Sequence, residues 1–205
     1  MNRLDTSSPD HLLVLARAGD VQALGELLEQ YRNYLTLLAG LELGRRLHGK
    51  LDEADVVQDV FLEAARHFDG FRGVTEREFL FWLRRIMATV LANIVRRYHG
   101  TKRRDVNLER ALADGLDGSS CALDGGLIAA RSSPSQYAAR REQAVLLADA
   151  LQRLPSSYRD AIILHHLEGL TFTEVAARLE RSLDSVKKLW VRGLEMLRGE
   201  LRSQS

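Results

Sequence analysis

The side chains best suited to bind another molecule lie between Ser182 and Arg192. Lysine and arginine there can donate to phosphates or to guanine edges, and serine can contact either a base or a phosphate. The residues that we expect on this surface are Ser182, Asp184, Ser185, Lys187, Lys188 and Arg192. A helix that presents such residues in its first turns can enter the major groove of duplex DNA.

A helix-turn-helix is the element that would position these side chains. Thr171 and Glu174 form the pattern of a capping box at the start of the first helix. Ser182 can cap the second helix, and the apolar residues expected to pack inward are Val175, Ala176, Leu179, Val186, Leu189, Trp190 and Leu194. The tight turn usually contains glycine, but here Glu180 occupies it, at a cost of about 1 kcal/mol. The alternative is a plain helical hairpin with solvated lysines.

A second set of residues, in the first half of the chain, combines acids, aromatic rings and bases. Five acids and no bases lie between Asp52 and Glu63, whereas seven bases and no acids lie between Arg84 and Arg104. The aromatic residues between these stretches are Phe68, Phe71, Phe79, Phe81 and Trp82. Aromatic rings beside a cationic track can hold unstacked bases, although rings at helical spacing are more often core. We therefore expect Phe79 and Trp82 in the core, and Phe71 and Arg72 at the surface.

Composition favours a helical protein. The chain has 205 residues, of which 45% are hydrophobic, 28% charged and 6% aromatic, with only three prolines. Abundant Leu, Ala, Glu and Arg predict an all-α fold. A single cysteine excludes an intrachain disulfide and a Cys-rich zinc site, and no signal peptide or membrane-spanning run is apparent. We expect a cytoplasmic protein without a metal or cofactor. The net charge of +1 alone argues against a nucleic-acid ligand, but the segregated charges indicate separate surfaces for separate partners.

The apolar periodicity predicts two small helical domains. Ser8 and Pro9 have the types expected at a helix start, one helix is predicted from about Val21 through Leu38, and another from about Thr75 to Tyr98. Residues 8–104 would form the first domain and 134–205 the second, which opens with a capping box at residues 133–136. The segment 105–133 would be a flexible linker, because 114–133 is rich in Gly, Ser, Asp and Ala. The alternative for this segment is a short helix and a loop inside one domain.

The order of these parts resembles the extracytoplasmic-function (ECF) sigma factors of bacterial RNA polymerase. Residues 52–62 (DEADVVQDVFL), 68–73 (FDGFRG) and 81–86 (FWLRRI) resemble region 2 of that group. Residues 151–155 (LQRLP), 158–159 (YR), 167–171 (LEGLT) and 185–188 (SVKK) resemble region 4. The resemblance covers most of residues 10–104 and 135–202. A single helix-turn-helix is a weak signal, but two motif sets in this order are a strong one.

The resemblance implies roles for individual residues. The acidic helix of region 2 would dock on the β′ clamp helices of core polymerase through Asp52, Asp55, Gln58 and Asp59. The loop 68–73 would hold an extruded base of the −10 element, and the residues implied at this element are Phe71, Arg72, Arg84, Arg85, Asn93, Arg96 and Arg97. Region 4 would read the −35 element as duplex DNA and touch the β flap of the polymerase. Thr89 and Asn93 stand where Asn and Asp are common, so the promoter sequence does not transfer. Anti-sigma partners are common in this group, although no residue here identifies one.

Two other functions remain as alternatives. An enzyme is disfavoured, because His165, His166 and Glu168 lack the spacing of a helical zinc site and no glycine-rich phosphate loop is present. We expect these histidines at a helix surface or partly buried. A polymerase-independent helix-turn-helix regulator of duplex operators would explain the second domain. That function leaves the acids, aromatic rings and bases of the first half without a role.

Overall fold

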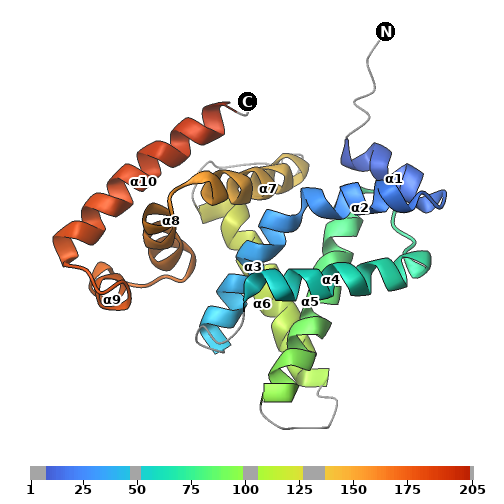
Figure 1. The fold of residues 1–205 in the computed structure, drawn as a ribbon, viewed down its shortest axis with the longest axis horizontal. Coiled ribbons are helices and arrows are strands. Elements are labelled where there is room, and N and C mark those ends of the chain that lie inside the picture. Colours follow the sequence, from blue (N-terminus) through green and yellow to red (C-terminus); the bar gives the residue numbers. More distant parts are fainter. Residues whose placement is uncertain (1–7, 47–51, 99–105, 127–136, 204–205) are drawn as a thin grey trace. The chain divides into compact units, whose positions relative to one another are not determined.

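The computed structural model describes residues 8–46, 52–98, 106–126 and 137–203, and every regular element in these ranges is helical (Figure 1). The predicted all-α fold is confirmed. The chain divides into two units, Met1–Gly118 and Ser119–Ser205. Among the described helices, none is long and apolar enough to cross a membrane.

Five helices and a short turn make up most of the first unit. They are α1 (Pro9–Arg17), α2 (Val21–Gln30), α3 (Arg32–Arg46), α4 (Glu53–His67), the 3-10 turn η1 (Phe68–Gly70) and α5 (Glu76–Tyr98). Helix α1 begins as predicted, with Ser8 Oγ accepting from the His11 N–H and Pro9 in the first turn. Helix α1 packs on α2, and α4 packs on both α3 and α5, so the apolar face of α4 is covered on two sides.

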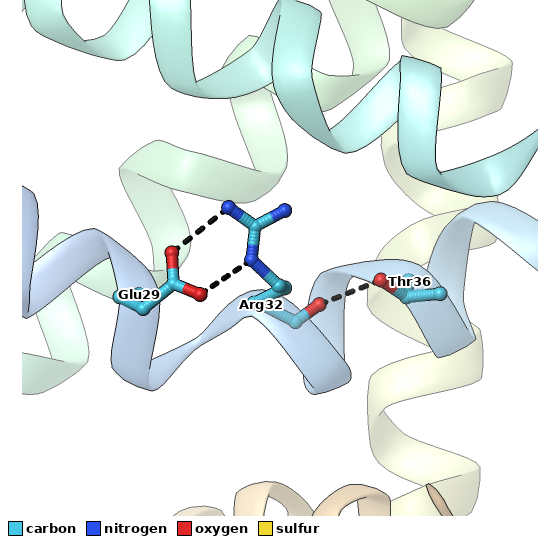
Figure 2. A network of polar contacts seen from close by, with 3 residues as sticks. All are labelled: Glu29, Arg32 and Thr36. Atoms are coloured by element: carbon cyan, nitrogen blue, oxygen red, sulfur yellow. Dashed lines mark hydrogen bonds and ion pairs between the residues drawn. The ribbon is translucent and has the colours of Figure 1, made fainter.

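The helix predicted from Val21 through Leu38 is interrupted at Tyr31. This residue is 1% exposed, and its hydroxyl donates to Glu76 Oε1 at 2.9 Å. Burial, followed by the charge of Glu76, raises the pKa of Tyr31. Figure 2 shows the junction, where Arg32 donates from Nε (2.6 Å) and Nη2 (2.8 Å) to the carboxylate of Glu29, and Thr36 Oγ1 donates to the Arg32 carbonyl at 2.9 Å. The apolar spacing continues through the break, so periodicity alone does not reveal it.

Helix α6 (Val106–Gly126) occupies most of the segment that we expected to be a flexible linker. Its Leu112 and Leu116 are fully buried. A Cβ at Gly115 would lie 2.9 Å from a carboxylate oxygen of the buried Glu42, so this close approach requires glycine. Residues 106–126 therefore form one helix of 21 residues, whereas the alternative placed only a short helix and a loop in this segment. Residues 105 and 127–133 lie outside the described residues, as does the capping box predicted at 133–136.

The second unit contains the two helices of the predicted helix-turn-helix and further helices before them. They are α7 (Tyr137–Arg153), α8 (Ser156–Ile162), the π-helical turn η3 (Ile163–Leu167), α9 (Phe172–Arg178) and α10 (Leu183–Ser203). Helices α7, α8 and α9 all pack against α10. Leu164, Val175 and Val186 form a buried cluster where η3, α9 and α10 meet, and this cluster fixes the crossing of the last two helices.

Candidate nucleic-acid interface

The start of α9 is fixed by the predicted capping box. The Thr171 backbone N–H and hydroxyl both donate to Glu174 Oε2 at 2.7 Å, while the Glu174 N–H donates to Thr171 Oγ1 at 3.3 Å. The hydrogen bonds from the hydroxyl and then from the backbone lower the pKa of Glu174. The carboxylate is therefore held in its charged form at the positive end of the helix.

The turn between α9 and α10 has a left-handed backbone at Glu180, the residue that the sequence analysis placed in the tight turn. Glu180 has φ 52°, the only non-glycine residue with positive φ among those described. The Arg181 N–H donates to the Ala176 carbonyl at 3.0 Å, and the Glu180 N–H donates to Ala177 at 3.4 Å. These two bonds form a Schellman motif, which ends α9 and turns the chain toward α10.

Helix α10 exposes the residues predicted to contact duplex DNA. Ser182 caps the helix by accepting from the Ser185 N–H at 3.3 Å. Val186, which follows Ser185, is fully buried. The residues on the opposite face of α10 are therefore directed away from the core. The exposed members of the predicted set are Ser182, Asp184, Lys187, Lys188 and Arg192, and Ser185 is partly exposed. The α9–α10 face therefore presents three cations and two hydroxyls within about three turns of helix.

His165 and His166 belong to an aromatic cluster with Phe172 and Trp190. The His165 ring stacks on Phe172 at 4.0 Å, and its Nδ1 lies 2.8 Å from the Leu170 carbonyl. The His166 ring stacks on the Trp190 ring, with centroids 5.5 Å apart. Burial of the His166 ring, followed by the charge of His165, lowers the pKa of His166. These contacts support the helix packing beneath α10. No group of three or more His, Cys, Asp or Glu side chains among the described residues is placed to hold a metal.

The predicted polymerase-binding residues lie on the outer face of α4. Asp55, Gln58 and Asp59 are exposed, whereas Val57 and Val60 on the opposite face are fully buried. Asp52 is exposed too, but its Oδ1 accepts from the Ala54 N–H at 2.8 Å, which caps the helix. The Asp52 carboxylate therefore stabilises the start of α4, whether or not it also contacts a partner.

The structure corrects the prediction that Phe71 is exposed. Only 7% of its surface is accessible, because its ring packs against Trp82 at 5.0 Å and Phe79 at 5.8 Å. Phe79 is fully buried, as expected, and Trp82 is partly buried. Arg72 remains exposed and donates to the Asp69 carbonyl at 2.6 Å. Phe71 therefore cannot serve as an open platform for a base in this structure.

Arg84 also differs from its expected position on a strand-binding surface. It is 7% exposed, its Nε donates to Asp117 Oδ1 at 2.7 Å, and its Nη1 donates to Tyr34 Oη at 3.2 Å. Burial disfavours the charged guanidinium, but Tyr34 and Asp117 together raise the pKa of Arg84. The side chain joins α5 to α3 and α6 and is not free to follow DNA.

The other basic residues of α5 are more accessible. Arg85 is exposed and lies over the Phe81 ring at 5.3 Å, and Arg97 is exposed. Arg96 is partly buried, hydrogen-bonds to Asn93 Oδ1, and lies 3.9 Å from Glu109 of α6. A usable cationic surface on α5 therefore runs mainly along Arg85 and Arg97.

Two adjoining hollows between α4 and α5 form a single feature, which we call the α4–α5 groove. One has a volume of about 280 Å³ and the other of about 240 Å³. Side chains common to both are Glu63, Val90 and Asn93. The polar and aromatic residues that complete the lining are Asp59, Arg66, His67, Trp82, Arg85, Thr89 and Arg97.

The groove brings together residues predicted separately, and it adds one that the sequence analysis did not select. Asn93, Arg85 and Arg97 were predicted to contact DNA, and Asp59 was predicted to contact polymerase. Glu63 was not assigned a role, although it lies four positions after Asp59 and so on the same helical face. The four-residue spacing from Asp59 was the only sequence signal for Glu63. It does not reveal that α5, whose Asn93 lies thirty residues further along the chain, forms the other side of the groove.

Comparisons with known proteins agree with the two motif sets. Residues 144–197 match the family described as "Sigma-70, region 4". "ECF RNA polymerase sigma factor SigW" of Bacillus subtilis (strain 168) is 26% identical over 189 residues, covering 91% of this chain and 92% of that protein. "ECF RNA polymerase sigma-E factor" of Escherichia coli (strain K12) is also 26% identical over 189 residues, with 92% coverage of each.

Among solved structures, "Structure of CnrH in complex with the cytosolic domain of CnrY" is 24% identical, covers 96% of this chain and 99% of that chain, and has a TM-score of 0.32. The sequence relatives extend over both helical units, and the region 4 match contains the helix-turn-helix and its flanking helices. On these matches, the chain is similar to ECF sigma factors of bacterial RNA polymerase over both helical units, and its residues 144–197 match region 4 of the sigma-70 family.

Proposed function

We propose that this protein binds core RNA polymerase, recognises −35 and −10 promoter elements, and promotes strand opening at transcription initiation. The observation that carries the proposal is the helix-turn-helix of the second unit. Its capping box, left-handed turn at Glu180 and exposed basic helix α10 have the geometry of a major-groove reader. The relatives named as sigma factors cover both units, and this coverage supports the link to polymerase.

The second unit would read the −35 element as duplex DNA. Lys187, Lys188 and Arg192 would meet phosphates or guanine edges, and Ser182 and Ser185 would contact phosphates or bases. Asp184, exposed in the first turn, is an acceptor that suits the amino group of cytosine.

The first unit would hold the opened −10 element. Arg72, Arg85 and Arg97 supply exposed cations, and Asn93 with its neighbour Arg96 lies at the α4–α5 groove. Phe71 and Arg84 would act from the interior, by supporting the shape of this face. Cationic side chains beside a partly exposed aromatic ring are the combination that binds single strands.

The acidic face of α4 would form the contact with core polymerase. Asp55, Gln58 and Asp59 project from one side of a helix that is otherwise anchored by buried valines. The protein would work as a non-catalytic factor in the cytoplasm, where its polymerase partner acts. An anti-sigma factor that covers either surface would block these contacts.

The alternative, a regulator that binds duplex operators without polymerase, explains only the second unit. It gives no role to the acidic face of α4 or to the α4–α5 groove. The sequence relatives carry sigma factor names over both units and do not favour this alternative. Association with core polymerase separates the two functions.

A pull-down of purified bacterial core polymerase by the full-length protein tests the proposal. We expect stable association for the wild type and at least a tenfold loss for the double variant Asp55→Lys with Asp59→Lys, because four units of charge change on the docking face. The matched control is Glu26→Lys with Glu195→Lys, which makes the same charge change at exposed positions elsewhere. Equal binding by both double variants would remove the proposed docking face; no binding by the wild type would favour the duplex regulator.

A further inference from the structure

Glu63 is the acidic side chain common to both hollows of the α4–α5 groove. Its side chain is 37% exposed, so its carboxylate can reach a ligand in the groove. Arg66 Nη1 lies 2.6 Å from Oε1 and His67 Nε2 lies 3.2 Å from Oε2. These two neighbours on α4 orient the carboxylate without using all of its acceptor positions, since each oxygen has two lone pairs.

A carboxylate in a surface that binds DNA needs compensation, because phosphates repel it. The groove lining supplies three arginines, Arg66 and Arg97 beside one hollow and Arg85 beside the other, against two acids, Glu63 and Asp59. With these cations in place, the negative charge of Glu63 is locally balanced. It can then act as a hydrogen-bond acceptor for a neutral group of the ligand.

We propose that Glu63 selects the base held in the α4–α5 groove by accepting a hydrogen bond from its exocyclic amino group. The inference rests on the proposed binding of the opened −10 element by the first unit. An ionised carboxylate only accepts, so its partner must donate. Adenine N6 and cytosine N4 are amino groups, whereas guanine and thymine carry at the corresponding carbon a carbonyl oxygen, which the carboxylate repels.

The remaining lining of the groove suits an unstacked base. Trp82 is partly buried at one end, where its ring can stack on a base. The Asn93 amide, held by its bond from Arg96, lies in the lining of both hollows and can pair with a second polar atom of the base edge. Extruded bases are read in this way elsewhere, by stacking and by hydrogen bonds to their pairing edge.

The experiment uses holoenzyme assembled from core polymerase and the full-length protein, on promoters taken from a transcription library. At each opened position of the −10 non-template strand, adenine is replaced by purine and cytosine by 2-pyrimidinone, which lack the amino group. We expect one position at which this deletion lowers open-complex formation on the order of tenfold for the wild type. In holoenzyme with Glu63→Ala, removal of the same amino group should change open-complex formation less than twofold.

Glu63→Gln is the second variant. Its amide can donate as well as accept, so it should tolerate thymine at that position about as well as the amino-bearing base. Glu26→Ala, at an exposed position on α2, is the matched control and should keep the wild-type preference. Circular dichroism and core binding show that each variant is folded and assembled.

The outcomes separate the inference from the function on which it rests. Loss of the amino-group dependence in Glu63→Ala, with preferences at other positions unchanged, supports the inference. An unchanged dependence, no dependence at any position in the wild type, or an equal loss for all bases in a folded variant would overturn it. If wild-type holoenzyme produces no transcript from any library member, the proposed function itself fails.

Discussion

The two units of the protein place their candidate binding residues in different ways. In the second unit, residues 182–192 follow one another along a single helix, and the polar members of this stretch remain at the surface. In the first unit, the candidate residues come from a loop and two helices, and the structure buries Phe71 and Arg84 among them. A surface set by one helix follows from short-range spacing, whereas a surface built from several elements depends on contacts that no local pattern contains.

The largest effect that tests this difference concerns Phe71. Phe71→Ala should lower the free energy of unfolding of the first unit by about 3 kcal/mol, because it removes a buried ring from the cluster with Phe79 and Trp82. Urea unfolding followed by Trp82 fluorescence in a Trp190→Phe background measures it. Phe81→Ala is the control, since Phe81 is 46% exposed, and it should cost well under 1 kcal/mol. Equal costs would mean that Phe71 is not part of the core.

Arg84 gives the second test. Arg84→Ala should destabilise the first unit by about 2 kcal/mol, because it leaves the Tyr34 hydroxyl and Asp117 without their guanidinium partner. Arg85→Ala, one residue along and exposed, should change stability by about 0.5 kcal/mol or less while weakening promoter binding. The same unfolding assay compares them. The opposite ranking would restore Arg84 to the DNA-binding surface.

The third test concerns the exposed helix of the second unit. Lys187→Ala with Lys188→Ala should weaken binding of holoenzyme to promoter DNA about tenfold at low salt and reduce the salt slope by roughly 2, because two phosphate contacts are lost. Stability should not change, since both side chains are exposed. Titration at several salt concentrations measures the slope, with Arg17→Ala on α1 as the control. An unchanged slope would exclude these lysines from the DNA contact.

The smallest effect concerns the turn before α10. Glu180→Gly should stabilise the second unit by up to about 1 kcal/mol, because glycine adopts a φ of 52° without the steric cost that Glu180 bears. Thermal unfolding followed by Trp190 fluorescence in a Trp82→Phe background measures it. Arg181→Gly, at the next position, should destabilise instead. A loss of stability in Glu180→Gly would mean that the side chain makes a contribution larger than the strain.

The features of the second unit were predictable because each rests on a short stretch of sequence. The capping box joins residues three apart, and the left-handed turn follows from the position of Glu180 between two helices. Helix α6 was not predicted as the preferred state of its segment, because its glycines and serines have weak helix propensity. Its support comes from elsewhere in the chain: Arg84, 33 residues before Asp117, and Glu42, against which Gly115 packs. Arg84 was expected at the surface because its partners Asp117 and Tyr34 lie 33 and 50 residues away. Phe71 packs on Phe79 and Trp82, which are close in sequence but belong to the following helix.

Run-off transcription from a promoter library, with core polymerase alone and with core polymerase plus the full-length protein, tests the central claim most directly. We expect specific transcripts only when the protein is present, from templates that share paired −35 and −10 elements. Tight binding to duplex DNA without any polymerase-dependent transcript would contradict the assignment of a sigma function.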